Sequence, residues 1–428
     1  MKEIKLDHIT KIYGHASLDV KITKDKTDVI LDIFEGSRFF EGLLRGKKYE
    51  EASAITSRIC GICSDSHVLT SILAVEDALG IRQTKQTELL RELLVISGWI
   101  RSHSLHSYFL ALPDYVGAGS IIDMAKTHKE EVARALALQR IGKNMHMAIG
   151  GRDVHTITAV VGGFTKVPKN EEIKFMLKEL KEGKKLALET VRMFSDMKCG
   201  KFERKRNFLS LKNDENYAIV GGDIDFNGHR IEKDMYRKHL TLQSRENSTT
   251  KIISFGKEEI MTGPLARINN NHQFLSRGAK KALNESGISL PSNSPLESNV
   301  FRAVELLHCI DRGIELLKSF TPKKEEIKKV KINGVCKGCA VTEAPRGVLY
   351  HEYTIDKRGF IRNSDIITPT AKNVRCIETD IKNLLPTIIK EQDDKIVLEL
   401  EKLIRSFDPC ISCSTHFLEV NWSGRKNS

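Results

Sequence analysis

The sequence contains no long run of apolar residues. A helix that spans a membrane needs about 18 or more consecutive apolar residues, and no stretch of that kind occurs in the 428 residues. The first residues, Met-Lys-Glu-Ile-Lys-Leu-Asp-His, also lack the apolar core of a secretory signal peptide. Both absences argue against a membrane span and predict a cytoplasmic protein.

Disulfide bonding is not indicated either. The nine cysteines are an odd number, and four of them form closely spaced pairs near the two ends of the chain. A secreted disulfide framework normally has an even set of regularly spaced cysteines. The thiols are instead typical of a protein in a reducing compartment.

Nucleic-acid-binding patterns are missing, although the charge is basic. The net charge is +12, and much of the excess lies in lysine stretches such as 323–331. No RRM, helix-turn-helix or zinc-finger pattern accompanies these residues. We interpret the excess charge as solvated helix faces and expect no nucleic-acid partner.

Two β-hairpins are predicted from the alternation of apolar and polar residues. The first lies within residues 1–35 and turns at 24–28, and the second lies near 347–367 and turns at 356–359. Polar stretches near 211–230 and 284–299 are interpreted as surface insertions.

Helical spacing of apolar residues predicts a long helix that begins near Thr84 and stops at Pro113. Further helices are expected at about 125–149, 170–195 and 297–320. There is no internal repeat and no low-complexity segment. Long helices with small sheets indicate one α+β domain, mainly helical, built on a helical bundle.

The strongest chemical signal is a pair of Cys-x-x-Cys motifs. They are Arg58-Ile-Cys60-Gly-Ile-Cys63-Ser-Asp-Ser-His67 and Asp408-Pro-Cys410-Ile-Ser-Cys413-Ser-Thr-His416. Each turn lets two thiolates converge on one ion, so together they can supply four sulfur ligands. Zinc knuckles usually close loops of about 15–20 residues, whereas these pairs stand 410 − 63 = 347 residues apart. Structural zinc, a redox or catalytic metal, and unligated thiols all stay open on spacing alone.

The two motifs resemble the signatures of nickel-iron hydrogenase large subunits. Further stretches resemble the same family in the same order: 35–41, 102–106, 112–114, 162–163, 266–270, 343–347 and 368–370. The motif sequences and the chain length are most similar to those of the cytosolic, NAD(P)-linked hydrogenases also known as sulfhydrogenases. The resemblance implies the large-subunit fold and the reversible splitting of H2. The alternatives are a metal-free, quinone-binding relative from a respiratory complex, against which the four intact cysteines speak, and a zinc-stapled scaffold.

The resemblance also implies a nickel-iron centre whose iron carries cyanide and carbon monoxide. Cys60 and Cys410 match the cysteines that bind nickel alone, and Cys63 and Cys413 match those that bridge nickel and iron. Four thiolates and two cyanides against two divalent metals leave a charge of about −2, which needs compensation when it is buried.

Other residues match positions around these metals. Arg346 matches an arginine over their open face, and its donors suit a cyanide nitrogen and a carboxylate such as Asp408 or Asp114. Thr370 is expected to donate to the other cyanide, and Pro345 of the same motif as Arg346 is expected to line the cofactor. Either Cys410 or Arg346 is expected to take the proton when H2 is split.

Glu41 and His416 match positions that hold magnesium or a similar structural cation. We expect His67, His103 and His106 to be structural hydrogen-bonding groups. An additional Cys-x-x-Cys at Cys336 and Cys339 does not match the family, and we interpret it as a pair of unligated loop thiols.

One motif departs from the family. Where the family has Arg-Ile-Glu-Gly-His, with a proton-relaying glutamate, this chain has Lys11-Ile-Tyr13-Gly-His15. A phenol with a pKa near 10 is a poor relay compared with a carboxylate. Another carboxylate, such as Glu343, has therefore replaced it, or turnover is slow.

The partner subunits can be inferred from the cofactor ligands that this sequence lacks. No further cysteine array suits iron-sulfur clusters, so a separate iron-sulfur small subunit is required. The resemblance to the NAD(P)-linked subgroup further implies electron-transfer subunits that bind flavin and NAD(P). We expect residues 1–416 to form the hydrogenase domain. Residues 417–428 are expected to be an extension that a maturation protease removes after nickel is loaded.

Overall fold

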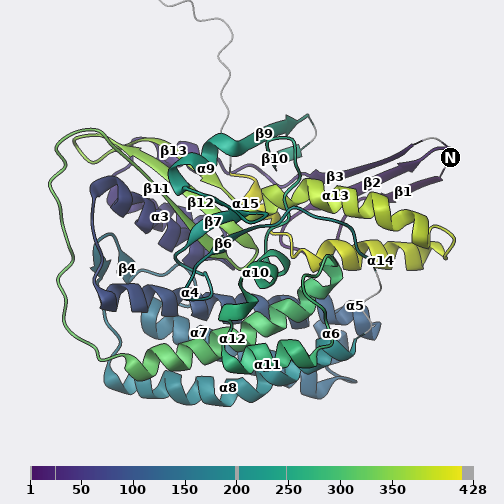
Figure 1. The fold of residues 1–428 in the computed structure, drawn as a ribbon, viewed down its shortest axis with the longest axis horizontal. Helices are drawn as coiled ribbons and strands as arrows, with labels where there is room; N and C mark the ends of the chain where they lie inside the picture. Colours follow the sequence, from purple (N-terminus) through teal and green to yellow (C-terminus); the bar gives the residue numbers. More distant parts are fainter. Residues whose placement is uncertain (1, 25, 198–201, 247, 417–428) are drawn as a thin grey trace, which may run out of the picture.

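The computed structural model describes residues 2–24, 26–197, 202–246 and 248–416. Long helices gather on one side of the molecule, and small antiparallel sheets with shorter helices lie on the other (Figure 1). This is the α+β, mainly helical architecture that the patterning predicts. Within the described ranges, no helix combines the length and the apolarity that crossing a bilayer requires.

Four long helices form the bundle: α4 (Lys85–Leu105), α7 (Lys129–Gly150), α8 (Asn170–Asp196) and α12 (Ser298–Ser319). α4 contacts α7 and α12, and α8 contacts the same two helices, so the bundle is closed. The helices expected at 125–149, 170–195 and 297–320 are therefore confirmed. α12 is buried on nearly all sides along its first half, because it packs against α4, α8, α10 (Pro264–Asn271) and α11 (Arg277–Glu285).

The expected stop of the first long helix at Pro113 is wrong. After α4 the chain continues through a π-helical turn (His106–Ala111) into α5 (Leu112–Val116). Pro113 lies in the first turn of α5, where the missing N–H is tolerated. The helical path ends at Gly117, whose φ of 69° is left-handed.

Both predicted hairpins are confirmed, and each gains a third strand. β2 (Ala16–Ile22) pairs with β3 (Thr27–Ile33), and β1 (Lys2–Leu6) adds to β2. β12 (Gly347–Ile355) pairs with β13 (Ile361–Ile367), and β11 (Cys336–Ala344) adds to β12. Cys336 and Cys339 therefore lie on a strand, and their interpretation as loop thiols is wrong.

Helix α3 (Ser64–Leu79) packs across β11 and β12, and this contact brings the first Cys-x-x-Cys motif to the sheet. The two backbones approach closely at Gly338, where an added Cβ would lie 2.1 Å from the backbone nitrogen of Ala78. Glycine is required there because any side chain would push α3 away from β11.

The two polar stretches are not surface insertions. The first contains parts of a three-stranded sheet, β6 (Leu209–Lys212), β7 (Asp223–Phe226) and β8 (His229–Ile231), with buried Leu211, Ile224 and Phe226. The second contains buried serines such as Ser292, whose N–H donates to Asn269 Oδ1 at 2.9 Å. Polar side chains that form hydrogen bonds with neighbouring backbone groups can be buried. A prediction of exposure from residue polarity alone does not take this into account.

The second end of the chain returns to the same region. α13 (Pro369–Ile388) packs on β3 and β10 and contacts α14 (Asp393–Ser406) and α15 (Ile411–Ser414). The remaining elements are α1 (Phe40–Leu44), α2 (Ala52–Thr56), α6 (Ile121–Met124), β4 (Ala159–Val160), β5 (Gly163–Phe164), α9 (Lys233–His239), β9 (Leu240–Arg245) and β10 (Ser248–Phe255).

Candidate metal centre

The four motif cysteines meet in the interior. The Sγ atoms of Cys60 and Cys410 are 3.5 Å apart, those of Cys63 and Cys413 are also 3.5 Å apart, and those of Cys410 and Cys413 are 3.1 Å apart. All four sulfurs lie within 4.8 Å of one another, and each side chain is buried. This arrangement suits a metal centre held by four sulfurs, and it brings together residues separated by most of the chain.

Backbone contacts hold the second cysteine pair in place. Residues Tyr13 and Cys410 form an isolated parallel bridge, in which the Ile411 N–H donates to the Tyr13 carbonyl at 2.7 Å. The Cys410 N–H donates to Thr370 Oγ1 at 3.0 Å. Gly14, with a φ of 102°, allows the close approach, because an added Cβ would lie 2.8 Å from Ile411 Cβ. The N-terminal segment and α13 therefore both clamp the loop that carries Cys410.

The sulfurs share protons because they are so close. Hydrogen bonding from Cys410 lowers the pKa of Cys60, while hydrogen bonding to Cys410 raises the pKa of Cys63 and of Cys413. Such a cluster holds one thiolate readily and resists further ionisation. Divalent metal ions overcome this resistance by replacing the protons.

Arg346 lies beside the sulfurs and is buried, with Nε donating to the Asp408 carbonyl at 2.8 Å and Nη2 to Asp408 Oδ1 at 2.9 Å. Its Nη1 is buried and has no hydrogen-bond partner in the described part of the chain. Arg346 and Thr370 line a small enclosed cavity together with Cys63, His67, Ala344, Leu349, Pro369, Cys410 and Cys413. An unpaired donor next to a cavity lined by three of the sulfurs fits a metal group that carries its own hydrogen-bond acceptors.

Asp408 is buried between two arginines. Burial raises the pKa of Asp408, and the positive charges of Arg346 and Arg302 oppose that rise. Arg302 Nε lies 3.9 Å from Asp408 Oδ2. Arg302 was not among the residues expected at this centre, although its place between Phe301 and Ala303 in the apolar first half of α12 was an available signal.

Asp114 does not pair with Arg346, which corrects one of the two carboxylates expected there. It accepts hydrogen bonds from Arg405 and, at 2.5 Å, from Lys11 Nζ. The π-helical turn and α5 carry Asp114 to the N-terminal segment, where these two cations engage it. Asp408, the other expected partner, is the one that Arg346 contacts.

Pro345 and Glu343 lie close to Arg346 in sequence but interact with Arg267. The Pro345 carbonyl accepts from Arg267 Nη2 at 2.9 Å, and the residues that line the cavity do not include Pro345. Glu343 Oε2 accepts from Arg267 Nη1 at 2.9 Å, and Oε1 accepts from the Leu211 N–H at 2.7 Å. Burial raises the pKa of Glu343 to about 7.

Glu41 and His416 both contact the backbone of one residue, Ile366 of β13. Glu41 Oε1 accepts from the Ile366 N–H at 2.9 Å, and His416 Nε2 lies 2.6 Å from the Ile366 carbonyl oxygen. His416 Nδ1 lies 2.6 Å from the Cys413 carbonyl oxygen. Burial lowers the pKa of His416, so the ring is neutral and its single N–H can serve only one of these two oxygens. A ring nitrogen, a carbonyl and a carboxylate that meet in this way suit a cation.

The other motif histidines make hydrogen bonds inside the protein, as expected. His67 Nδ1 lies 3.2 Å from His351 Nε2, His103 Nε2 lies 3.1 Å from Glu305 Oε2, and His106 Nε2 lies 2.7 Å from the Arg405 carbonyl. Burial lowers the pKa of His67 to about 3 and that of His103 to about 4, so both rings are neutral at pH 7. His351 was not identifiable from the sequence, because it is a single histidine on strand β12 and belongs to no motif.

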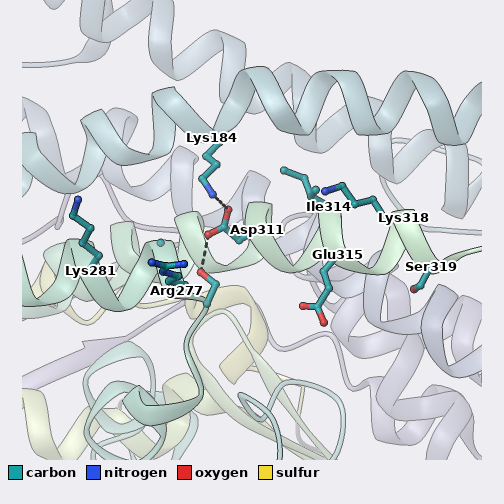
Figure 2. A pocket seen from close by; sticks show the side chains of 10 residues that line it. Lys184, Arg277, Lys281, Asp311, Ile314, Glu315, Lys318 and Ser319 are labelled. Carbon is teal, nitrogen blue, oxygen red and sulfur yellow. Dashed lines mark hydrogen bonds and ion pairs between the residues drawn. The ribbon is translucent and has the colours of Figure 1, made fainter.

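Two other features are separate from this centre. Asp77, Asp234 and Cys339 lie together, with Cys339 Sγ 3.0 Å from Asp234 Oδ1, but Lys233 already pairs with Asp77. A wide groove of about 900 Å³ lies among α8, α11 and α12, where Lys184 reaches Asp311 at 2.6 Å (Figure 2). In the groove Lys184 and Asp311 pair with each other, while the lining as a whole has four cationic and two anionic side chains.

Comparison with known proteins gives consistent results. The family model for nickel-dependent hydrogenases matches residues 38–136 and 225–416. Sulfhydrogenase 1 subunit alpha of Pyrococcus furiosus is 34% identical over 428 aligned residues, which cover 97% of this chain and 98% of that protein. The NAD-reducing hydrogenase HoxS subunit beta of Cupriavidus necator is 25% identical over 97% of this chain and 95% of its own length.

Solved structures resemble this fold over nearly its whole length. The crystal structure of an NAD+-reducing NiFe hydrogenase in the H2-reduced state has a TM-score of 0.86 at 23% identity, covering 97% of this chain and 100% of that one. A Ni-Fe-Se hydrogenase from D. vulgaris Hildenborough has a TM-score of 0.82 at 22% identity, with 97% and 100% covered.

Proposed function

Because the chain belongs to the nickel-dependent hydrogenase family, we propose which of its residues serve the reversible splitting of H2 and how. The chain is the large, catalytic subunit of such an enzyme. Cys60 and Cys410 bind nickel alone, and Cys63 and Cys413 bridge nickel and iron. The observation that carries this proposal is the set of four buried sulfurs within 4.8 Å of one another, next to an arginine with an unpaired donor.

The iron is proposed to carry cyanide and carbon monoxide. When bound, the nickel-iron group supplies the heterolytic cleavage of H2 into protons and electrons. Arg346 Nη1, which is buried and unpaired, would donate to a cyanide nitrogen, and Thr370 would donate to the other, since its oxygen accepts from the Cys410 N–H and its hydroxyl hydrogen stays available. A structural zinc ion would need neither the cavity nor these two donors.

The proton acceptor is proposed to be the sulfur of Cys410, or Arg346 acting with the metal. Cys410 is close to the Arg346–Asp408 pair, whose carboxylate belongs to the same loop. In a site closed to water, the positive charge of a neighbouring guanidinium stabilises the anionic sulfur cluster and keeps the sulfur available for a proton.

Glu41, His416 and the Ile366 carbonyl are proposed to hold magnesium or a similar cation. The support is the neutral His416 ring, which lies within hydrogen-bond distance of two carbonyl oxygens but has one proton to donate. A cation bound to the ring nitrogen, the carbonyl and the carboxylate removes that conflict.

Electrons are proposed to leave to a separate iron-sulfur small subunit. In the described ranges, the four cysteines above are the sole cluster of sulfur ligands. The exposed side chains of Phe34, Phe39 and Leu43, here called the apolar face, come from one short segment of the chain, which also includes Glu41. Arg38, inside that segment, donates to the carbonyls of Ile59 and Ser412 at 2.6 and 2.8 Å. An apolar surface so close to the cysteine loops suits the subunit that must receive electrons over a short distance.

Further subunits that bind flavin and NAD(P) are proposed to carry the electrons onward. The support is the naming of one relative as a subunit of an NAD-reducing hydrogenase. We assign the enzyme to the cytoplasm, and the eight described cysteines, all of them free thiols, agree with a reducing compartment. A maturation protease is proposed to act on residues 417–428.

The experiment that tests the centre combines metal analysis, infrared spectroscopy and mutation. Purified enzyme should contain about one nickel and one iron and show infrared bands of iron-bound carbon monoxide and cyanide. Cys410→Ser should lose nickel and all H2 uptake, because a soft terminal ligand is replaced by a hard one. Cys309→Ser is the matched control, since Cys309 is equally buried but lies on α12 away from the cluster.

The outcomes separate this function from its alternatives. About one zinc per chain and no nickel would indicate a scaffold protein with a structural zinc site. No metal at all would indicate a quinone-binding relative. Uptake of H2 by Cys410→Ser at the wild-type rate would contradict the ligand assignment.

A further inference from the structure

The side chain of Tyr13 lies against the guanidinium of Arg346. The Arg346 Cζ atom is 4.8 Å from the centre of the Tyr13 ring. The Tyr13 hydroxyl is buried and has no hydrogen-bond partner in the described part of the chain. The contact with Arg346 is therefore made by the ring, and within the same ranges the hydroxyl binds no other group.

The ring is held in place by its own backbone. The Tyr13 carbonyl accepts from the Ile411 N–H at 2.7 Å, and the Tyr13 N–H donates to the Pro409 carbonyl at 3.4 Å. On either side, Lys11 is anchored to Asp114 and Gly14 packs against Ile411. Tyr13 thus belongs to the rigid clamp on the Cys410 loop and does not move independently of it.

The guanidinium of Arg346 needs a second restraint. Its two hydrogen bonds, from Nε and Nη2, both go to Asp408 and fix one edge of the group. Hydrogen bonds along one edge leave the plane free to tilt about that edge, and Nη1 lies on the unpaired side. A cation over a ring face is attracted by the ring quadrupole, so the ring opposes such tilting.

We propose that Tyr13 is a positioning residue, whose ring sets the plane of the Arg346 guanidinium so that Nη1 faces the metal-bound group. This inference rests on the role proposed for Arg346 in the function above. It assigns Tyr13 a part in catalysis that needs the aromatic ring and does not need the hydroxyl or any change in its protonation.

The test compares variants of the intact, metal-loaded enzyme. Tyr13→Phe keeps the ring and should retain at least about half of the turnover. Tyr13→Leu removes the ring and should lower turnover about thirtyfold, the size expected for one desolvated cation–π contact. Nickel and iron contents should be unchanged in both. Phe360→Leu is the matched control, because it removes a ring that lies against Lys48 and Arg358 instead of Arg346, and it should leave turnover as it is.

Two readouts separate positioning from a general structural effect. The infrared bands of iron-bound cyanide should shift in Tyr13→Leu in the same direction as in Arg346→Lys, and should stay in place in Tyr13→Phe. The double variant Tyr13→Leu/Arg346→Lys should turn over no more slowly than Arg346→Lys alone, because residues that act through one another are not additive.

Four results would overturn the inference. Turnover in Tyr13→Phe as low as in Tyr13→Leu would mean that the hydroxyl is what matters. Multiplied losses in the double variant, or loss of nickel in Tyr13→Leu, would mean that Tyr13 does not act through Arg346. If Arg346→Lys turns over like the wild type, the role proposed for the arginine itself fails. The Arg346→Lys variant alone shows this, so the failure can be told apart from a failure of the role of Tyr13.

Discussion

The charged side chains beside the sulfurs have a net positive charge, which favours an anionic group at the centre. Arg346 and Arg302 are both buried, and Asp408 lies between them. Two positive charges and one negative charge leave an excess of about +1 close to a proposed cluster of about −2. In an interior of low dielectric this partial compensation is worth more than in water, which explains why two buried arginines are tolerated there.

Glu343 provides a prediction at the scale of a residue. Its cluster contains Arg267 and the carboxylate of Glu305, which accepts from Arg267 Nε at 2.6 Å, so a neutral Glu343 balances the charge. Its folded pKa of about 7 is above the usual value for a glutamic acid. The folded protein therefore keeps a proton that the unfolded chain has released, and the stability this provides is present at low pH and is lost as pH rises towards 7.

Glu343→Gln should accordingly keep H2 turnover and gain stability relative to the wild type between pH 5 and pH 8. Thermal unfolding of both proteins across this pH range measures how the difference in stability changes with pH. Glu378→Gln is the control for turnover, because Glu378 also binds a backbone N–H and an arginine. A steep loss of hydrogen-deuterium exchange in Glu343→Gln alone would instead identify Glu343 as the proton relay that Tyr13 does not provide.

Among the elements, α1 and the segment before it have two faces. Phe40, Glu41 and Leu44 point inward, and Glu41 reaches the Ile366 peptide of β13. Leu43, on the same helix, is 53% exposed and belongs to the apolar face. A helix of five residues that carries both Glu41, the proposed cation ligand, and an exposed leucine connects the proposed centre to the surface over one turn.

The prediction for this element is a loss of electron transfer without a loss of chemistry. Leu43→Asp should weaken binding of the small subunit and abolish H2-dependent dye reduction, because a charge would be buried at the interface. Hydrogen-deuterium exchange, which needs no electron acceptor, should persist. Leu136→Asp on α7, where the leucine is 57% exposed, is the matched control and should change neither measurement. Co-purification of the partner with Leu43→Asp at the wild-type level would contradict the assignment of this face.

At the scale of the whole molecule, the centre is built by joining the two ends of the chain. The first cysteine pair depends on α3 and its sheet, whereas the second pair and His416 lie on the last described residues. His416 is buried against β13, so the final segment must enter the interior before the centre is complete. Metal loading is therefore proposed to come before the last step of folding.

The corresponding prediction concerns residues 417–428, which are 428 − 416 = 12 residues long and end in the polar run Ser-Gly-Arg-Lys-Asn-Ser. We expect the mature, nickel-loaded chain to end at His416, because a polar extension would not be buried with it. Intact mass of the active enzyme measures this. A gene that stops after His416 is the control, and its product should contain less nickel if the extension holds the site open. An active, metal-replete chain that still includes Ser428 would contradict the proposal.

The sequence by itself determined which cysteines meet at the proposed metal centre, and most of the regular structure. Cys60, Cys63, Cys410 and Cys413 were identifiable because a metal demands particular ligands at short, fixed spacings, and the hairpins and bundle helices because apolar periodicity is local. The strand β11, the sheet within 211–230 and the path beyond Pro113 were not identifiable, since each depends on what packs against it.

Only the tertiary structure decided the partners of the charged and aromatic side chains. Asp114 pairs with Arg405 and Lys11, Glu343 with Arg267, and Tyr13 stacks on Arg346, and in each case the partners come from distant parts of the chain. A carboxylate or a ring can satisfy its interactions with many groups, so residue type does not select one of them. The selection follows from which elements pack together, because a buried charge must be paired with whatever opposite charge the packing brings within a few ångströms.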